Sequence, residues 1–129
     1  MNDLTVVTEF RLKLYPKDFN KVREFYEQEL GYTVMNEWDR PDGKGAMFDI
    51  GGTTFELLSP EAGFKPIASV DVSWRVKDVW KLYESMKDKP YMVRELQDND
   101  WGDTSFHITD PEGFLITFFA QTNKRVENE

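Results

Sequence analysis

The residues best suited to chemistry in this chain are one histidine and a set of acidic and aromatic side chains. His107 is the only histidine among 129 residues and lies within WGDTSFHITDPEGFLITFFA, residues 101–120. A lone histidine on a strand serves as a proton carrier, a ligand contact or a structural residue, and the sequence leaves these roles open. The chain has no cysteine, which excludes a thiolate metal ligand and a cysteine nucleophile.

Other catalytic patterns and several binding functions are disfavoured. No spacing supports a Ser/His/acid trio, and the stretches DGKG and GG are typical of hairpin turns rather than phosphate-binding loops. The net charge is −8, from 24 acidic and 16 basic residues, without the Lys/Arg cluster that nucleic-acid binding requires. The acidity serves either solubility or the attraction of a cationic ligand.

The length and composition predict one domain with a substantial core. Forty per cent of the residues are hydrophobic, which is enough to offset the entropy cost of ordering the chain. No apolar run approaches the roughly 18 residues of a membrane span, and MNDLTVVTEF lacks the pattern of a secretory signal. We therefore expect a cytoplasmic protein with no membrane partner.

The elements that must position the candidate residues occur twice. Residues 10–14 alternate as a strand, and Asp18 caps a helix that ends near Gly31. Three strands follow, and then residues 69–120 repeat the order: strand, helix from Asp78, three strands. The predicted strands after the first are 32–38, 46–50, 53–58, 69–76, 91–96, 104–108 and 114–120. The chain is thus predicted to be an α+β protein of two tandem strand–helix–three-strand (βαβββ) units, about 5–58 and 69–120, with a polar tail at 121–129.

The residues repeat as well as the elements. KDFNKVRE (17–24) aligns with KDVWKLYE (77–84) at a spacing of 60, and four of the eight positions match. FDI (48–50) aligns with FHI (106–108), and TFEL (54–57) with LITF (115–118), which makes the second turn three residues longer. In this alignment His107 corresponds to Asp49.

Strand alternation sorts the residues into two faces. The apolar set, which we expect beneath the helices, is Phe10, Leu12, Phe48, Ile50, Phe55, Leu57, Val72, Trp74, Phe106, Ile108, Ile116 and Phe118. The opposite set mixes charged, hydroxyl and bulky apolar groups, which suits a concave cup that holds a ligand. The candidate ligand-binding residues, from this set and from the turns at its rim, are Arg11, Trp38, Met47, Asp49, Glu56, Asp71, Trp101, His107, Thr117 and Phe119.

The duplicated order, FYEQELGY (25–32) and DPEGFLITFF (110–119) resemble the vicinal oxygen chelate superfamily over residues 8–120. That superfamily includes glyoxalase I, extradiol dioxygenases, and fosfomycin- and bleomycin-resistance proteins. The resemblance implies four metal-ligand positions, which fall near Arg11 and on Glu56, Asp71 and Thr117. Only Glu56 matches the usual residue. Asp71 could bind a metal, whereas a guanidinium has no free lone pair and a threonine hydroxyl is a poor ligand.

These departures favour the binding branch of the superfamily. We expect no cofactor and a metal-independent homodimer that sequesters an aromatic or cationic small molecule, as the resemblance to bleomycin-resistance proteins implies. Trp38, Trp101 and Phe119 would stack on the ligand, and Glu56, Asp71 or Asp49 would take its positive charge. Packing is the alternative role for Trp38 and Trp101, and the preferred one for Trp74 and Trp80.

Two alternatives stay open at this point. The first is a glyoxalase-type lyase or isomerase that uses a divalent ion on Glu56 and Asp71, with or without His107. The second is a scaffold or regulator whose cup is filled by its own ion pairs among Arg11, Glu56 and Asp71. Glu56 is accordingly expected either as the partner of Arg11 or as a metal ligand.

Overall fold

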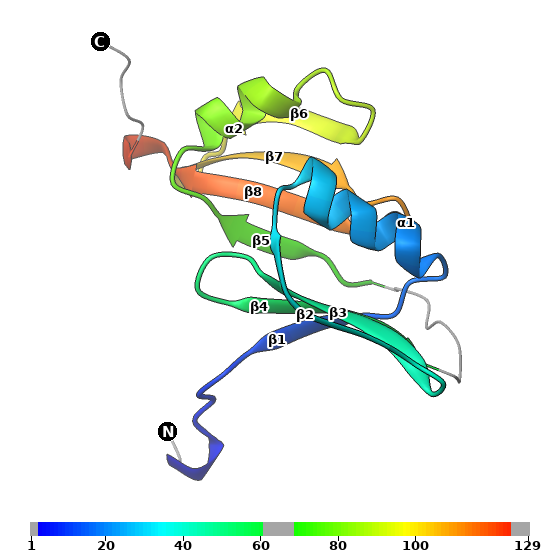
Figure 1. Ribbon diagram of the computed structural model, residues 1–129. Helices are drawn as coiled ribbons and strands as arrows, with labels where there is room; N and C mark the ends of the chain where they lie inside the picture. Colours follow the sequence, from blue (N-terminus) through cyan, green and yellow to red (C-terminus); the bar gives the residue numbers. More distant parts are fainter. Residues whose placement is uncertain (1–2, 61–68, 125–129) are drawn as a thin grey trace. The chain divides into compact units, whose positions relative to one another are not determined.

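A computed structural model of the chain describes residues 3–60 and 69–124 (Figure 1). Its contacts divide the chain into two compact units, Met1–Ile67 and Ala68–Glu129, in agreement with the predicted repeat. Most of the segment between the two predicted units, from residue 61 onward, and the end of the predicted polar tail lie outside the described residues. Each unit is described by itself below.

Unit 1 has the predicted element order. Its strands are β1 (Arg11–Leu14), β2 (Thr33–Arg40), β3 (Gly43–Asp49) and β4 (Thr54–Pro60). They form one sheet in the order β1-β4-β3-β2, in which only β1 and β4 are parallel. The predicted single helix consists of α1 (Phe19–Glu24) and a π-helical segment (Phe25–Glu29), and it ends before Gly31, whose φ of 73° fits the predicted stop.

Unit 2 repeats this arrangement. Its strands are β5 (Val72–Arg75), β6 (Met92–Asp98), β7 (Asp103–Thr109) and β8 (Leu115–Gln121), and α2 spans Val79–Met86. The sheet order is β5-β8-β7-β6, again with only the first pair parallel (Figure 1). Each α-helix starts at the predicted aspartate, because Asp18 accepts a hydrogen bond from the Lys21 amide and Asp78 from the Lys81 amide.

The apolar face of each sheet forms the core of its unit, as the alternation predicts. Phe48, Phe55, Phe106 and Ile116 are fully buried. In unit 2 the ring of Tyr83 meets Phe106 edge-on at 5.4 Å between centroids, which seats α2 on its sheet. Phe10 is an error in the predicted set: it precedes β1 and is 71% exposed, so the first strand starts one residue later than predicted.

The fifth strand is also shorter than predicted. The alternation over residues 69–76 predicts a strand of that length, but β5 covers only Val72–Arg75. Val70 is exposed, and the positive φ of Ser69 breaks the extended conformation before the strand begins.

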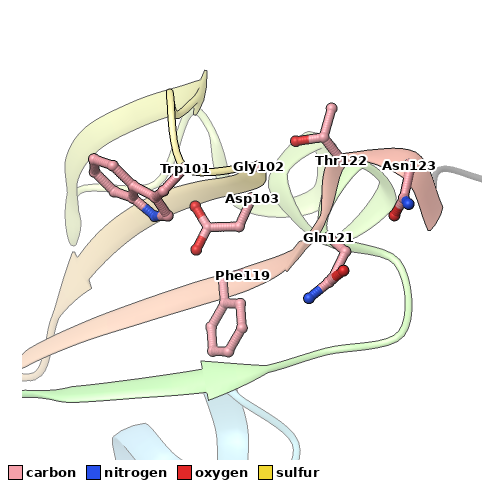
Figure 2. A pocket seen from close by; sticks show the side chains of 7 residues that line it. All are labelled: Trp101, Gly102, Asp103, Phe119, Gln121, Thr122 and Asn123. Atoms are coloured by element: carbon pink, nitrogen blue, oxygen red, sulfur yellow. The ribbon is translucent and has the colours of Figure 1, made fainter.

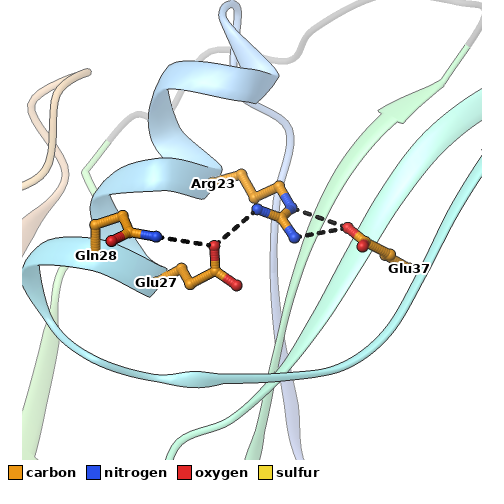
Figure 3. Close-up of polar contacts among 4 residues, drawn as sticks. All are labelled: Arg23, Glu27, Gln28 and Glu37. Carbon is orange, nitrogen blue, oxygen red and sulfur yellow. Dashed lines mark hydrogen bonds and ion pairs between the residues drawn. The ribbon is translucent and has the colours of Figure 1, made fainter.

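A polar link also connects α1 to the sheet of unit 1 (Figure 3). Arg23 pairs with Glu37 of β2 at 2.8 Å and with Glu27, one turn further along the helical segment, at 3.1 Å. Gln28 donates a hydrogen bond to the same Glu27 carboxylate at 3.4 Å. Because Glu37 is more than half exposed, we expect this link to orient the helix more than to stabilise it.

The strand registers correct the predicted alignment of the two repeats. Met47 lies opposite Glu56, and His107 lies opposite Thr117, so His107 corresponds to Met47 rather than to Asp49. The spacing from Met47 to His107 is 60 and that from Glu56 to Thr117 is 61, so the second turn is longer by one residue, not three. Matching FDI with FHI by their phenylalanines shifted the predicted alignment by two residues. His107 was therefore assigned to the correct face of the sheet but to the wrong position along the strand.

Among the residues that the structure describes, every helix is too short or too polar to cross a lipid bilayer.

Candidate functional site

The candidate residues lie on the sheet faces that point away from the helices, which we call the open faces. On unit 1 the open face carries a row in which Lys13, Glu56, Met47 and Asn36 are neighbours across β1, β4, β3 and β2. On unit 2 the equivalent row is Ser73, Thr117, His107 and Arg94. The predicted site residues therefore separate into two groups, one on each unit.

On unit 1, Glu56 forms an ion pair with Arg11. The Nη1 atom of Arg11 donates to Oε1 of Glu56 at 2.7 Å, and the side chain of Glu56 is only 6% exposed, against 41% for Arg11. Glu9 adds a second, longer contact to the guanidinium at 3.3 Å. The hydrogen bonds that Arg11 donates to Glu56 and, to a lesser extent, to Glu9 raise the pKa of Arg11 above its usual value. The nearly buried carboxylate thus already has its counter-charge.

The donors on unit 1 do not fit a metal ion. Two residues of β1 lie next to Glu56: Lys13 is directly opposite it in the sheet, and Arg11 donates a hydrogen bond to its carboxylate. Both of these side chains are positively charged. Neither a protonated ammonium nor a guanidinium offers a lone pair to a metal. One carboxylate whose oxygen accepts from a guanidinium would be a weak ligand for a divalent cation.

The equivalent positions on unit 2 are no better suited. Thr117 of β8 lies opposite Ser73, and both offer neutral hydroxyls. Asp71 is exposed and immediately precedes β5. Within the described parts of the two units, no group of three or more His, Cys, Asp or Glu side chains could hold a metal ion. The residues present therefore do not fit the metal centre that the resemblance implies.

The remaining candidates on unit 1 are partly engaged. Trp38 lies so closely over Gly45 that a Cβ atom at position 45 would overlap the indole. The guanidinium of Arg40 lies 5.6 Å from the centre of the Trp38 ring. Asp49 accepts a hydrogen bond from the Gly51 amide at 2.9 Å and so stabilises the turn after β3. Met47 is half-buried beside Glu56.

On unit 2, four of the predicted residues lie together around a concavity, which we call the Trp101 hollow. It consists of two adjoining cavities of ≈ 420 and ≈ 540 Å³ that share Trp101, Asp103 and Phe119. The first cavity is also lined by Ser73, Arg94, Gln97, Asn99, Ser105, His107 and Thr117. The second extends over Gly102 and the end of β8, with Gln121, Thr122 and Asn123 (Figure 2). His107, Thr117, Trp101 and Phe119 are thus brought into one site.

A chain of hydrogen bonds organises the polar wall of the Trp101 hollow. Arg94 donates to the Ser105 hydroxyl at 2.7 Å, and Asn99 donates to the same hydroxyl at 3.0 Å. Asn99 also donates to Asp103 at 2.7 Å and accepts from Gln97 at 2.8 Å. Trp101, the one tryptophan that lines the hollow, is 77% exposed. Fixed polar groups beside an exposed aromatic surface are typical of a small-molecule site.

Most of this polar wall was not predicted from the sequence. The lining residues that were not expected there are Arg94, Gln97, Asn99 and Asp103. In β6 the register shifts between Met92 and Arg94 and again between Arg94 and Gln97. Strict alternation would place Arg94 on the same face as Met92, whereas the bulge at Val93 turns it to the open face. No residue type in MVRELQD marks that bulge, so the sequence carried no signal for it.

The environment of His107 disfavours its protonated form. Partial burial and the charge of Arg94 lower the pKa of His107 below its usual 6.5, with Asp71 acting in the opposite direction. The imidazole is therefore neutral at physiological pH and offers one donor and one acceptor to the Trp101 hollow. In the unfolded chain His107 has its usual pKa of 6.5, which is higher than its pKa in the folded protein. Protonation below pH 6.5 therefore favours the unfolded chain and lowers the stability of the fold.

We expect NMR titration of His107 to give a pKa below 6.5. Arg94→Gln removes a positive charge and should raise that pKa, whereas Asp71→Asn should lower it further. Because the chain has a single histidine, one imidazole resonance reports the titration without assignment. A pKa at or above 6.5, or one that Arg94→Gln leaves unchanged, would contradict this account of the wall.

Solved structures with this fold include proteins named as glyoxalases and as a lactoylglutathione lyase. A glyoxalase/bleomycin resistance protein/dioxygenase from Nocardioides superposes with a TM-score of 0.69 at 18% identity, covering 98% of this chain and 93% of that chain. A lactoylglutathione lyase from Agrobacterium tumefaciens gives 0.69 at 16% identity, covering 89% and 94%. A glyoxalase I mutant from Zea mays gives 0.72 at 18% identity, covering 92% of this chain and 46% of that one. At these identities the likeness extends to the fold alone.

Sequence comparison identifies the family. No curated protein sequence matches the chain significantly. The family model for the Glyoxalase/Bleomycin resistance protein/Dioxygenase superfamily matches residues 8–118, which is most of the chain and includes both repeats. Together with the two βαβββ units, this match shows that the chain belongs to the Glyoxalase/Bleomycin resistance protein/Dioxygenase superfamily.

Proposed function

We propose that this protein binds an aromatic small molecule in the Trp101 hollow without the help of a metal ion, in the manner of bleomycin-resistance proteins. The observation that carries the proposal is an aromatic pair, the exposed Trp101 and the half-buried Phe119, beside a preformed hydrogen-bonded wall. A planar ring gains stacking and burial there at little conformational cost. The ion pair between Arg11 and Glu56 supports metal independence, because it uses the carboxylate that matches the family ligand.

The described side chains support an aromatic ring in the predicted ligand more than they support a positive charge on it. Of the three carboxylates expected to take that charge, Glu56 is paired with Arg11, and Asp49 accepts from the Gly51 amide. Asp71 is exposed and does not line the Trp101 hollow. The aromatic surfaces of Trp101 and Phe119, by contrast, are accessible within the hollow.

Calorimetric titration with planar aromatic probes tests the proposal. We expect at least one of 2-naphthol, 2-naphthoate and 2-naphthylmethylammonium to bind, and Trp101→Ala to weaken that binding about tenfold, or roughly 1.4 kcal/mol, through lost stacking. Trp101→Phe should retain most of the affinity. Val93→Ala is the control, since Val93 is an exposed apolar residue of unit 2 that does not line the Trp101 hollow. Absence of binding for all three probes would refute the proposed function.

A metal-dependent lyase of the glyoxalase type is the second candidate. It is favoured by the fold that this chain shares with a glyoxalase I and a lactoylglutathione lyase, and by Glu56 at one family ligand position. The cations beside Glu56 and the hydroxyls at the equivalent row of unit 2 disfavour it. Elemental analysis of protein purified without chelators separates the candidates: stoichiometric Ni, Zn, Mn or Fe would reverse their order.

A further inference from the structure

Two arginines of unit 2 differ from the other arginines that the structure describes. Arg11, Arg23 and Arg40 each form an ion pair with a carboxylate. Arg75 and Arg94 form none with any described residue, although the chain carries an acidic excess of 24 to 16. In so acidic a protein, a guanidinium without a carboxylate partner indicates a position at which positive charge is kept available.

Both of these guanidinium groups lie beside Phe119. Arg75 is the neighbour of Phe119 on β5, and its guanidinium lies 5.5 Å from the centre of the ring. Ser105 is the neighbour of Phe119 on β7, and Arg94 reaches across from β6 to donate to its hydroxyl. The hydrogen bond from Nη2 to Ser105 holds the head group of Arg94 against the wall of the Trp101 hollow.

The charges at the Trp101 hollow do not repeat the acidic excess of the whole chain. Asp103 is the one carboxylate among its lining residues, and it already accepts a hydrogen bond from Asn99 at 2.7 Å. Arg94 lines the hollow and Arg75 lies on the Phe119 ring, while Asp71 acts on His107 from outside the lining. Salt screens exposed charges beyond about 8 Å at physiological ionic strength, so contacting guanidinium groups outweigh distant surface carboxylates.

Neutral groups in the same row suit an anion as well. The hydroxyls of Ser73 and Thr117 and the imidazole of His107 lie in register with Arg94 across the sheet. His107, the neighbour of Arg94 in this row, can donate a hydrogen bond to an oxygen of a carboxylate that Arg94 binds. A carboxylate accepts several such bonds, and a planar guanidinium matches its two oxygens.

We infer that the ligand of the Trp101 hollow is an aromatic carboxylate, with its ring on Trp101 and Phe119 and its anionic group on Arg94. This inference rests on the proposed function and adds the charge of the ligand, which is opposite in sign to the charge that the composition suggests. Arg94 makes the main contact, and Arg75 contributes through its position on the Phe119 ring.

The three naphthalene probes test this inference because they share a ring and differ in charge. We expect 2-naphthoate to bind at least tenfold more tightly than 2-naphthol, and 2-naphthylmethylammonium to bind most weakly. Arg94→Gln should abolish the preference for 2-naphthoate while leaving the affinity for 2-naphthol within about twofold. Arg40→Gln is the matched control, because it removes the same charge from unit 1, and it should leave the preference intact.

The outcomes distinguish the two claims. If 2-naphthol or the ammonium probe binds as tightly as 2-naphthoate, the inference is overturned while the proposed aromatic site stands. Retention of the full preference in Arg94→Gln would likewise overturn it. If none of the probes binds to the wild-type protein, the proposed function fails and the inference fails with it. The comparison of probes on the wild-type protein needs no variant, so misfolding of Arg94→Gln would not prevent a decision.

Discussion

Replacing Asp110 by alanine is expected to lower the free energy of unfolding by about 3 kcal/mol. Asp110 follows β7 and is only 3% exposed. Its Oδ1 atom accepts hydrogen bonds from the amides of Glu112 at 2.8 Å and Phe114 at 3.0 Å. Alanine leaves both amides without this acceptor, and an unsatisfied buried donor costs about 1–3 kcal/mol.

The turn that Asp110 holds also positions the site. Gly113 has a φ of 88°, and its amide donates to the Asp110 carbonyl, which closes the turn before β8. This turn sets the register in which His107 lies opposite Thr117. We therefore expect Asp110→Ala to weaken binding in the Trp101 hollow as well as stability.

Urea denaturation measures the effect of Asp110→Ala, with two control variants. Glu112→Ala changes an exposed residue of the same turn and should cost less than about 0.5 kcal/mol. Asp110→Asn keeps an acceptor oxygen but loses the charge, so its cost should fall between the two. If Asp110→Ala lies within 1 kcal/mol of the wild-type protein, the carboxylate does not hold the turn.

Tyr26→Ala should have an even larger effect, a loss of about 4 kcal/mol. Tyr26 is fully buried in the π-helical segment of unit 1. The centre of its ring lies 4.6 Å from the ring centre of Phe55 and 6.2 Å from that of Phe48, and both phenylalanines are on the core face of the sheet. Deleting the ring removes the main aromatic contact between the helical segment and the sheet and leaves a cavity.

The ion pair between Arg23 and Glu37 also connects the helix to the sheet of unit 1, and its removal provides a comparison for Tyr26→Ala. Arg23→Ala removes the ion pair with Glu37, which is more than half exposed, and should cost about 0.5 kcal/mol. Tyr26→Phe keeps the ring and should cost far less than Tyr26→Ala. Chemical denaturation of the three variants gives the ranking, and a loss for Arg23→Ala equal to that for Tyr26→Ala would contradict it.

The fold was predictable because the signals for it are local and repeated. Asp18 and Asp78 marked the helix starts, and the alternation in FDI and FHI marked strands in which Phe48, Phe106 and Ile108 are buried. One error concerned Phe10, an apolar residue that was expected in the core but is exposed to solvent. A second concerned Asp49 and His107, which the similar motifs FDI and FHI aligned but which the strand pairing does not place at equivalent positions.

The site was predictable only in part. Alternation correctly brought His107, Thr117 and Phe119 to one face, and the turn composition placed Trp101 near it. The resemblance implied the pairing of Arg11 with Glu56, because the two residues fall near and on metal-ligand positions of the superfamily. The polar wall did not follow, because the bulge at Val93 depends on pairing between strands rather than on residue type.

The bulges in β2 and β6 have a consequence beyond the site. β2 and β6 are each the last strand at one edge of their sheet. A bulge leaves Met35 of β2 out of the ladder, and the first of two register shifts in β6 leaves out Val93. An approaching β-strand from another molecule would meet amides and carbonyls that are out of phase with its own. These two edge strands are thereby protected against amyloid-like polymerisation, even though the bulged side chains Met35 and Val93 are apolar and more than half exposed.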